Sequence, residues 1–210
     1  MTLTLAEANR AIAGAIGKAV VLQADGRIVI AGQAQNGFSS VNGVVARLNA
    51  DGSVDTGFGS TGSVSVPGAT DLKSIAGLSD GRFLVAGTAV VDRQFRPLTA
   101  RITAAGAVDA SYGDNGVMVL DSVNGSFNAA LLLADGRVAA VGTTVGQSSG
   151  SPDLLYTVLS ADGALDAGFG TNGQGYVERR PVNGSRVAAN TAALRADGGV
   201  LMVGSFGNSP

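Results

Sequence analysis

The 210-residue chain contains no cysteine and no histidine, and it has only two lysines, Lys18 and Lys73. Without cysteine and histidine it cannot form a thiolate zinc site, a histidine haem ligand, a cysteine nucleophile or a histidine-dependent triad. We therefore expect no cofactor and no metal. The formal net charge is −2 and the basic residues are scattered, so neither nucleic acid nor an anionic membrane surface is an expected partner.

Long apolar runs are also missing from the chain. No stretch of about 18 apolar residues occurs, which predicts no membrane insertion. The first twenty residues carry Glu7, Arg10 and Lys18 without a continuous apolar segment, so no secretory signal peptide is predicted. Because 45% of the residues are hydrophobic and only 14% are charged, we expect a folded domain.

Glycine is abundant, with 32 residues against 5 prolines, and much of it falls in repeated motifs. The segment "LQADGRIVIAG" (22–32) returns as "GLSDGRFLVAG", "LLADGRVAAVG" and "LRADGGVLMVG". Its aspartates are Asp25, Asp80, Asp135 and Asp197, spaced by 55, 55 and 62 residues. A second motif follows in three copies, as "ADGSVDTGFGSTG", "AAGAVDASYGDNG" and "ADGALDAGFGTNG". The chain therefore holds three full repeats and about half of a fourth.

Each repeat predicts four strands. Asp-Gly between apolar runs favours a hairpin with a type I′ turn, which gives strands at 19–24 and 27–32 in the first copy, with Gly32 at a strand end. A third run ("VVARLN", "LTARIT", "LYTVLS") and a short fourth ("GSVSV", "GVMVL", "GQGYV") complete the unit. We expect an all-β fold, a β-propeller-like array of four-stranded antiparallel blades at 18–68, 69–123, 124–181 and, in part, 182–210.

Residues 1–17 do not follow the repeat. Thr4 and Glu7 match a capping box, which marks the start of a helix. The apolar residues at helical spacing are Leu5, Ala8, Ile12 and Ile16. We predict a short amphipathic α-helix that covers a strand edge or an end of the propeller. A helix that binds a partner or a membrane surface is the alternative.

The two motifs resemble the delta-60 repeat, a bacterial β-propeller family with units of the form "LQPDGKIVVAG" followed by "ARLNADGSLDTSFG". The resemblance covers about residues 18–205, and "ARLNADGSVDTGFG" (46–59) is a close match. Copy two departs from this pattern with Ala105, where the other copies have Asp51 and Asp162. Copy four has Gly199 in place of arginine. The resemblance implies a module of large surface-associated or secreted proteins, and it implies no reaction. The N-terminal "LTLAEANRAIAGAIGKA" is similar to the first helix of the GlcG/HbpS-like family, some of whose members bind haem; no site is carried over from it.

Nine aspartates occupy turn positions of the two motifs. They are Asp25, Asp51, Asp55, Asp80, Asp109, Asp135, Asp162, Asp166 and Asp197. A short carboxylate accepts hydrogen bonds from the amides of such turns, and we interpret these residues in that way. A role as paired general acids or calcium ligands would require convergent carboxylates, and no calcium-loop motif occurs. We therefore assign no catalytic residue.

Other repeated side chains also have a structural interpretation. One aromatic recurs in each copy, at Phe58, Tyr112 and Phe169. We predict that these rings fill the interface between blades, although they could form a stacking platform for a sugar or a base. Arg47 and Arg101 are expected on a strand face rather than in an anion site, because the third copy has Val158 at this position.

The segments that differ most between repeats are 33–43, 88–97 and 143–154. In repeat proteins such segments gather on one face, which often binds a ligand or partner, although they can also be unconstrained loops. The candidate ligand-binding residues there are Phe38, Arg93, Phe95 and Arg96.

Three and a half blades leave an open sheet edge, which is unfavourable for a soluble protein. The remainder of a longer propeller, a second chain in a homo-oligomer, or the N-terminal helix could cover it. We expect a non-catalytic scaffold or binding platform whose partners are other protein chains. The alternatives are a self-assembling structural subunit and a carbohydrate-active enzyme that uses aspartates outside the turns. Those aspartates include Asp92, Asp114, Asp121 and Asp153.

Overall fold

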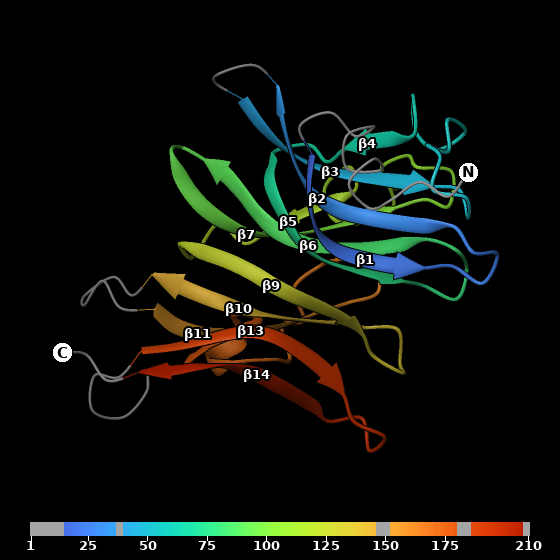
Figure 1. Cartoon of the computed structure of the whole chain (residues 1–210). Helices are drawn as coiled ribbons and strands as arrows, with labels where there is room; N and C mark the ends of the chain where they lie inside the picture. The colour runs from blue at the N-terminus through green and yellow to red at the C-terminus, as the bar shows by residue number, and fades with distance from the viewer. Residues whose placement is uncertain (1–14, 37–39, 146–151, 180–185, 208–210) are drawn as a thin grey trace.

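The computed structural model describes residues 15–36, 40–145, 152–179 and 186–207, which form an all-β fold (Figure 1). The first sheet contains β1 (Ala15–Leu22), β2 (Ile28–Asn36), β3 (Ser40–Leu48) and β4 (Ser63–Ser65). The second contains β5 (Ala69–Gly77), β6 (Phe83–Val91), β7 (Gln94–Ile102) and β8 (Val117–Val119). The third contains β9 (Gly125–Leu132), β10 (Val138–Val145), β11 (Pro152–Leu159) and β12 (Tyr176–Arg179). The last contains β13 (Arg186–Leu194) and β14 (Val200–Gly207).

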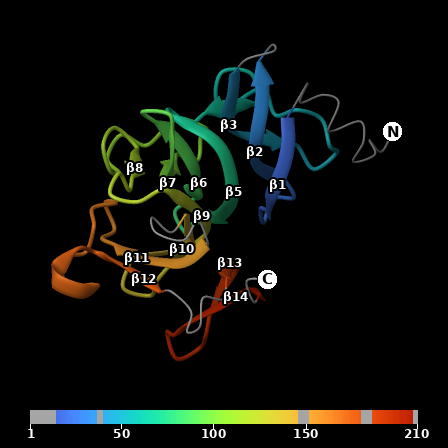
Figure 2. The same cartoon turned by 90° about the vertical axis from the view of Figure 1, so that its left-hand side faces the viewer.

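The sheets are arranged as propeller blades. Within each sheet the strands follow the chain order, and each pairs antiparallel with the next. The first strands, β1, β5, β9 and β13, contact one another in series and lie along the concave side of the row, while β8 and β12 lie on its outer side (Figure 2). The predicted β-propeller-like array of four-stranded antiparallel blades is confirmed.

The hydrophobic core lies between neighbouring sheets. Val29, Phe58 and Val85 belong to one buried cluster between the first and second sheets. Leu84 and Phe127 belong to another between the second and third. Strand β6 is buried continuously from Phe83 to Ala89, because a middle blade is covered on both faces and its strands need no alternation of polar and apolar residues.

The predicted N-terminal helix is wrong where the structure describes it. Ala15 and Ile16 begin strand β1 and pair with Ala34 and Gln33 of β2. The edge of β2 offers hydrogen-bond partners to the backbone, and pairing with it outweighs the local helical pattern. The rest of the predicted helix lies outside the described residues. Within the described ranges the only helical element is the short 3₁₀ turn η1 (Thr171–Gly173), and no helix there could cross a membrane.

The Asp-Gly hairpins use a different turn from the one predicted. The amide of Gly26 donates to the carbonyl of Gln23 at 3.0 Å, and the amide of Gln23 donates to the carbonyl of Arg27 at 2.8 Å. Gly26 has a φ of +83°, whereas Asp25 has no positive φ. This is a type I turn followed by a glycine bulge, not a type I′ turn. Only the glycine must be left-handed, and the carboxylate of Asp25 adds a hydrogen bond from the amide of Arg27 at 3.1 Å.

Every first strand carries a β-bulge at the same repeat position. The extra residues are Lys18, Lys73, Asn128 and Asn190. A glycine of the second strand lies beside each bulge, at Gly32, Gly87, Gly142 and Gly204. A Cβ atom on Gly87 would lie 1.9 Å from the carbonyl oxygen of Asp71, so the bulge brings the two backbones too close for any side chain. The prediction that Gly32 ends a strand is wrong, because β2 continues to Asn36.

Candidate functional site

The aspartates of the motifs serve the turns, as predicted. In every case except Asp162 the Oδ1 atom accepts a hydrogen bond from the backbone amide two residues further on. The carboxylate of Asp162 instead accepts a hydrogen bond from the hydroxyl of Ser160. These local bonds stabilise the turns and account for the aspartates without a ligand.

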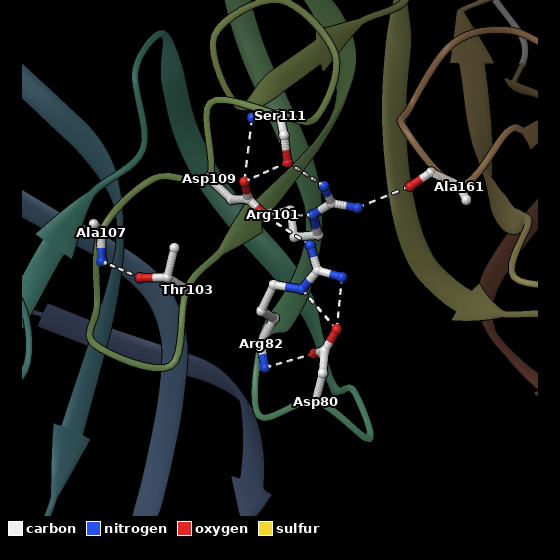
Figure 3. Close-up of polar contacts among 8 residues, drawn as sticks. All are labelled: Asp80, Arg82, Arg101, Thr103, Ala107, Asp109, Ser111 and Ala161. Carbon is white, nitrogen blue, oxygen red and sulfur yellow. Dashed lines mark hydrogen bonds and ion pairs between the residues drawn. The ribbon is translucent and has the colours of Figure 1, made fainter.

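Arg101 on β7 connects the second repeat to the third (Figure 3). Its side chain is mostly buried, and its Nε donates to Asp109 at 2.7 Å. Its Nη1 donates to the carbonyl of Ala161 in the next repeat at 2.8 Å, and its Nη2 donates to the hydroxyl of Ser111 at 2.8 Å. The guanidinium also lies 5.0 Å from the ring centre of Tyr112. We call Arg101, Asp109, Tyr112 and the Ala161 carbonyl the interblade clasp.

The first repeat contains the same arrangement. Arg47 donates to Asp55 at 2.7 Å and to the carbonyl of Ala104 in the second repeat at 2.8 Å. Its guanidinium lies 4.6 Å from the ring centre of Phe58. A backbone hydrogen bond of 2.9 Å from the amide of Gly59 to the carbonyl of Ala105 joins the same two repeats. Arg47 and Arg101 are thus structural links between blades, which is more than the strand-face role predicted for them.

The third repeat differs because Val158 replaces the arginine. Asp166 there pairs with Arg137 of its own repeat at 2.9 Å. The ring of Phe169 packs edge-to-face on Tyr156, with 5.0 Å between ring centres. Phe58 and Tyr112 are fully buried against the following repeat, as predicted for interface rings, whereas Phe169 is only half-buried.

Two members of the clasp, Asp109 and Tyr112, have shifted pKa values. Partial burial by itself raises the pKa of Asp109, but hydrogen bonds from Ser111, Arg82 and Arg101 outweigh it and hold that pKa well below the usual 3.8. Burial raises the pKa of Tyr112 to about 12, although a hydrogen bond with Thr99 opposes the rise. Asp109 therefore remains ionised in the folded protein at mildly acidic pH.

Asp109→Asn should make the protein less sensitive to acid. Since the pKa of Asp109 is lower in the folded than in the unfolded chain, its stabilising contribution is present above about pH 4 and is lost as the pH falls below that value. The difference in unfolding free energy between wild type and Asp109→Asn should thus be large at pH 6 and shrink at about pH 2.5. Urea unfolding at both pH values measures it, with the exposed Asp121→Asn as control. An equal difference at both pH values would contradict the assignment.

A hollow of about 470 Å³ lies where the first three sheets meet. All three variable segments contribute to its wall, through Gln33, Val41, Thr88, Phe95, Thr143, Thr144, Val145 and Pro152. The first strands contribute Thr70, Asp71, Lys73, Gly125 and Ser126. Segments that differ between repeats therefore surround one cavity, while the repeated motifs lie in the turns and interfaces.

A bulge places the positively charged group of this hollow. Lys73 is the extra residue of the β5 bulge, and its Nζ donates to Ser126 at 2.9 Å and to Asn128 at 3.1 Å. Asn128 is the extra residue of the β9 bulge and donates through Nδ2 to the carbonyl of Ala189 on β13 at 2.7 Å. This polar chain joins the first strands of three sheets, and it holds the ammonium group in the wall of the hollow.

A family model matches two segments of the chain. It is described as a domain of unknown function (DUF5122) beta-propeller. The matched residues are 23–58 and 78–112. Each segment begins at an Asp-Gly hairpin and ends at the interface aromatic, Phe58 or Tyr112, so the match covers the two motifs that build a blade. No curated protein matches the chain.

The structure brings together only some of the residues that the sequence suggested. Phe95 is 63% exposed and lines both the 470 Å³ hollow and a smaller hollow of about 210 Å³ beside it. Arg93, at a φ of +62° in the β6–β7 turn, lines the smaller one. Arg96 lines neither of these two hollows, and its Nη2 donates to Gln94 at 2.6 Å. Phe38 lies outside the described residues.

Sequence reasoning missed the residues that the first strands contribute to the hollow, above all Lys73 and Asp71. A signal for Lys73 was present, because the position seven residues before each Asp-Gly aspartate is polar in all four copies. These residues are Lys18, Lys73, Asn128 and Asn190. Such a repeated polar position within a strand is typical of a bulge that directs side chains to a shared centre.

None of the aspartates suggested for an enzyme lines the 470 Å³ hollow. Asp114 lies in the segment before β8 and accepts a hydrogen bond from Asn115 at 2.8 Å. Asp92 lies in the β6–β7 turn, Asp121 is exposed after β8, and Asp153 is buried on β11. The carboxylate that lines the 470 Å³ hollow is Asp71, which was not among them. In the part of the chain that the structure describes, no group of three acidic residues could hold a metal ion.

Proposed function

We propose that this chain is a non-catalytic β-propeller module that binds a ligand in the 470 Å³ hollow. The observation that carries the proposal is that the three segments that differ between repeats meet around this one cavity. A repeat protein keeps its motifs for folding and varies the surface that recognises a ligand. The volume also falls within the range of about 300–1,000 Å³ usual for small-molecule sites. The surface or secreted setting implied by the delta-60 resemblance is part of this proposal.

The chemistry of the acidic residues supports the non-catalytic part of the proposal. General acid–base catalysis with carboxylates needs two of them on either side of the reacting bond. The motif aspartates are bound to turn amides and to arginines, and several have lowered pKa values, which is the wrong direction for a general acid at neutral pH.

Amide chemical shifts of labelled protein test the proposal with a mixed library of neutral, anionic and cationic fragments. We expect fragments that bind to change the amide shifts of Thr88, Phe95 and Thr143 most. We expect Phe95→Ala to weaken the binding of these fragments. Leu201→Ala is the matched control, because this apolar residue is also about half exposed but does not line the hollow. Shifts that concentrate elsewhere, or no shifts at all, would overturn the proposal.

Self-assembly is a second candidate function, and a specific observation favours it. Exposed apolar side chains occur on the two terminal sheets, with Val20 and Leu22 on β1 and Leu201 and Val203 on β14. Strand β14 pairs only with β13 among the described strands, so one of its edges is open to another strand.

Light scattering tests this candidate. If the apolar faces of the terminal sheets associate, the mass should rise with protein concentration, and Val203→Lys should restore the monomer mass because a charge on the contact face opposes association. Val90→Lys is the control, because Val90 is also an exposed valine but lies on the second sheet, which is not a terminal one. It should not change the mass. A monomer mass at all concentrations would count against self-assembly.

A further inference from the structure

We propose that the 470 Å³ hollow binds a neutral saccharide of one or two rings, an inference that rests on the proposed binding function. Hydroxyl groups form much of its polar wall. They belong to Thr70, Thr88, Ser126, Thr143 and Thr144, which come from β5, β6, β9 and β10. The hydroxyls of Thr70 and Ser126 already donate to the carbonyl of Thr88 and to Asn128, so they can only accept from a ligand. A hydroxyl without such a bond can both donate and accept, as each hydroxyl of a sugar does.

Thr144 gives the most specific sign of a missing ligand. Its side chain is only 2% exposed, it lines the hollow, and its Oγ1 has no hydrogen-bond partner among the described residues. A buried hydroxyl without a partner is unfavourable. Because this Oγ1 is closed to solvent, the Thr144 side chain would turn toward the hollow when a sugar enters, and a sugar hydroxyl would then supply the partner.

The charges of the wall favour an uncharged ligand. Lys73 and Asp71 both line the hollow, so the charged side chains there sum to zero. The ammonium of Lys73 is held by Ser126 and Asn128. A polyanion or polycation would meet a group of its own sign in the same cavity, whereas the hydroxyls of a neutral sugar can bond to either group.

The rim supplies an apolar surface. Phe95 is exposed at the edge of the hollow beside Val41, Val145 and Pro152. A pyranose ring has a face of C–H groups that packs on an aromatic ring, and covering an exposed phenyl group is favourable. The combination of an aromatic rim and a hydroxyl wall therefore fits the two chemical faces of a sugar.

Titration calorimetry with maltose, cellobiose, galacturonic acid, alanine and inorganic phosphate tests the proposal. We expect a neutral disaccharide to bind, and Phe95→Ala and Thr144→Val each to weaken it about tenfold, a loss comparable to one hydrogen bond. Thr144→Val removes a hydroxyl without a partner and conserves shape, so its melting temperature should not fall. Leu201→Ala should bind as wild type does.

The outcomes separate this inference from the proposed function. If only charged probes bind and Phe95→Ala weakens their binding, the saccharide inference fails while the hollow remains the binding site. If a disaccharide binds equally well to both variants, it binds elsewhere and the inference fails. If no saccharide binds and no fragment in the library shifts the signals of the hollow, both fail.

Discussion

Alanine at Gly87 is expected to lower the free energy of unfolding by about 4 kcal/mol or more. The new Cβ would lie 1.9 Å from the carbonyl oxygen of Asp71 and 2.9 Å from the Cα of Leu72. Both atoms are backbone, and they are fixed by the pairing of β5 with β6. The methyl group therefore cannot be accommodated by a side-chain rotation, and the bulge of Lys73 must open. Urea unfolding followed by circular dichroism measures the loss.

Gly207→Ala is the matched control for this substitution. Gly207 also lies in the second strand of a hairpin, but nothing is within 4 Å of its added Cβ. Its unfolding free energy should stay within about 0.5 kcal/mol of wild type. Gly142→Ala, whose Cβ would lie 1.9 Å from the carbonyl of Ser126, should behave like Gly87→Ala. If Gly87→Ala and Gly207→Ala were equally stable, the repeated bulge would be the wrong explanation for these glycines.

The blade could be predicted from the sequence because its signals are local and repeated. The Asp-Gly pairs, the apolar runs and the fixed spacing each depend on a few neighbouring residues, and their repetition fixes the four-strand unit. The bulges could not be predicted in this way. They depend on how β1 or β5 meets its partner strand, and the same glycine that lies beside a bulge is also a common residue at a strand end. Gly32 was misplaced for that reason.

The outer part of the candidate site could be predicted, and the inner part could not. Variation between repeats pointed to the hairpin ends that hold Phe95, because variation is visible in one sequence that contains several copies of a unit. Asp71 and Ser126 reach the same hollow from different sheets. Their proximity follows from the angle between blades, which no single repeat encodes. The prediction of an N-terminal helix was wrong for a related reason. Residues at the end of the predicted helix pair with β2, which lies outside the segment from which the helix was predicted.

The second large effect is expected from Arg101→Ala, which should lower the free energy of unfolding by about 3–5 kcal/mol. Arg101 is 8% exposed and pairs with Asp109 at 2.7 Å. Its removal would leave that carboxylate partly buried with one fewer counter-charge, and it would free the carbonyl of Ala161 in the next repeat. The cost is high because both the ion pair and the link between blades disappear. Chemical unfolding near pH 7 gives the value.

Arg137→Ala separates the clasp from an ordinary ion pair. Arg137 bonds to two aspartates, Asp135 and Asp166, whereas Arg101 bonds to one, but the Arg137 side chain is 45% exposed. Solvent screens such pairs, so its removal should cost less than about 1 kcal/mol. Arg101→Val should cost less than Arg101→Ala, because the third repeat accommodates valine at this position, as Val158. Equal losses for Arg101→Ala and Arg137→Ala would mean that burial and the bond to the next blade contribute nothing, and that the blades are joined by their apolar faces alone.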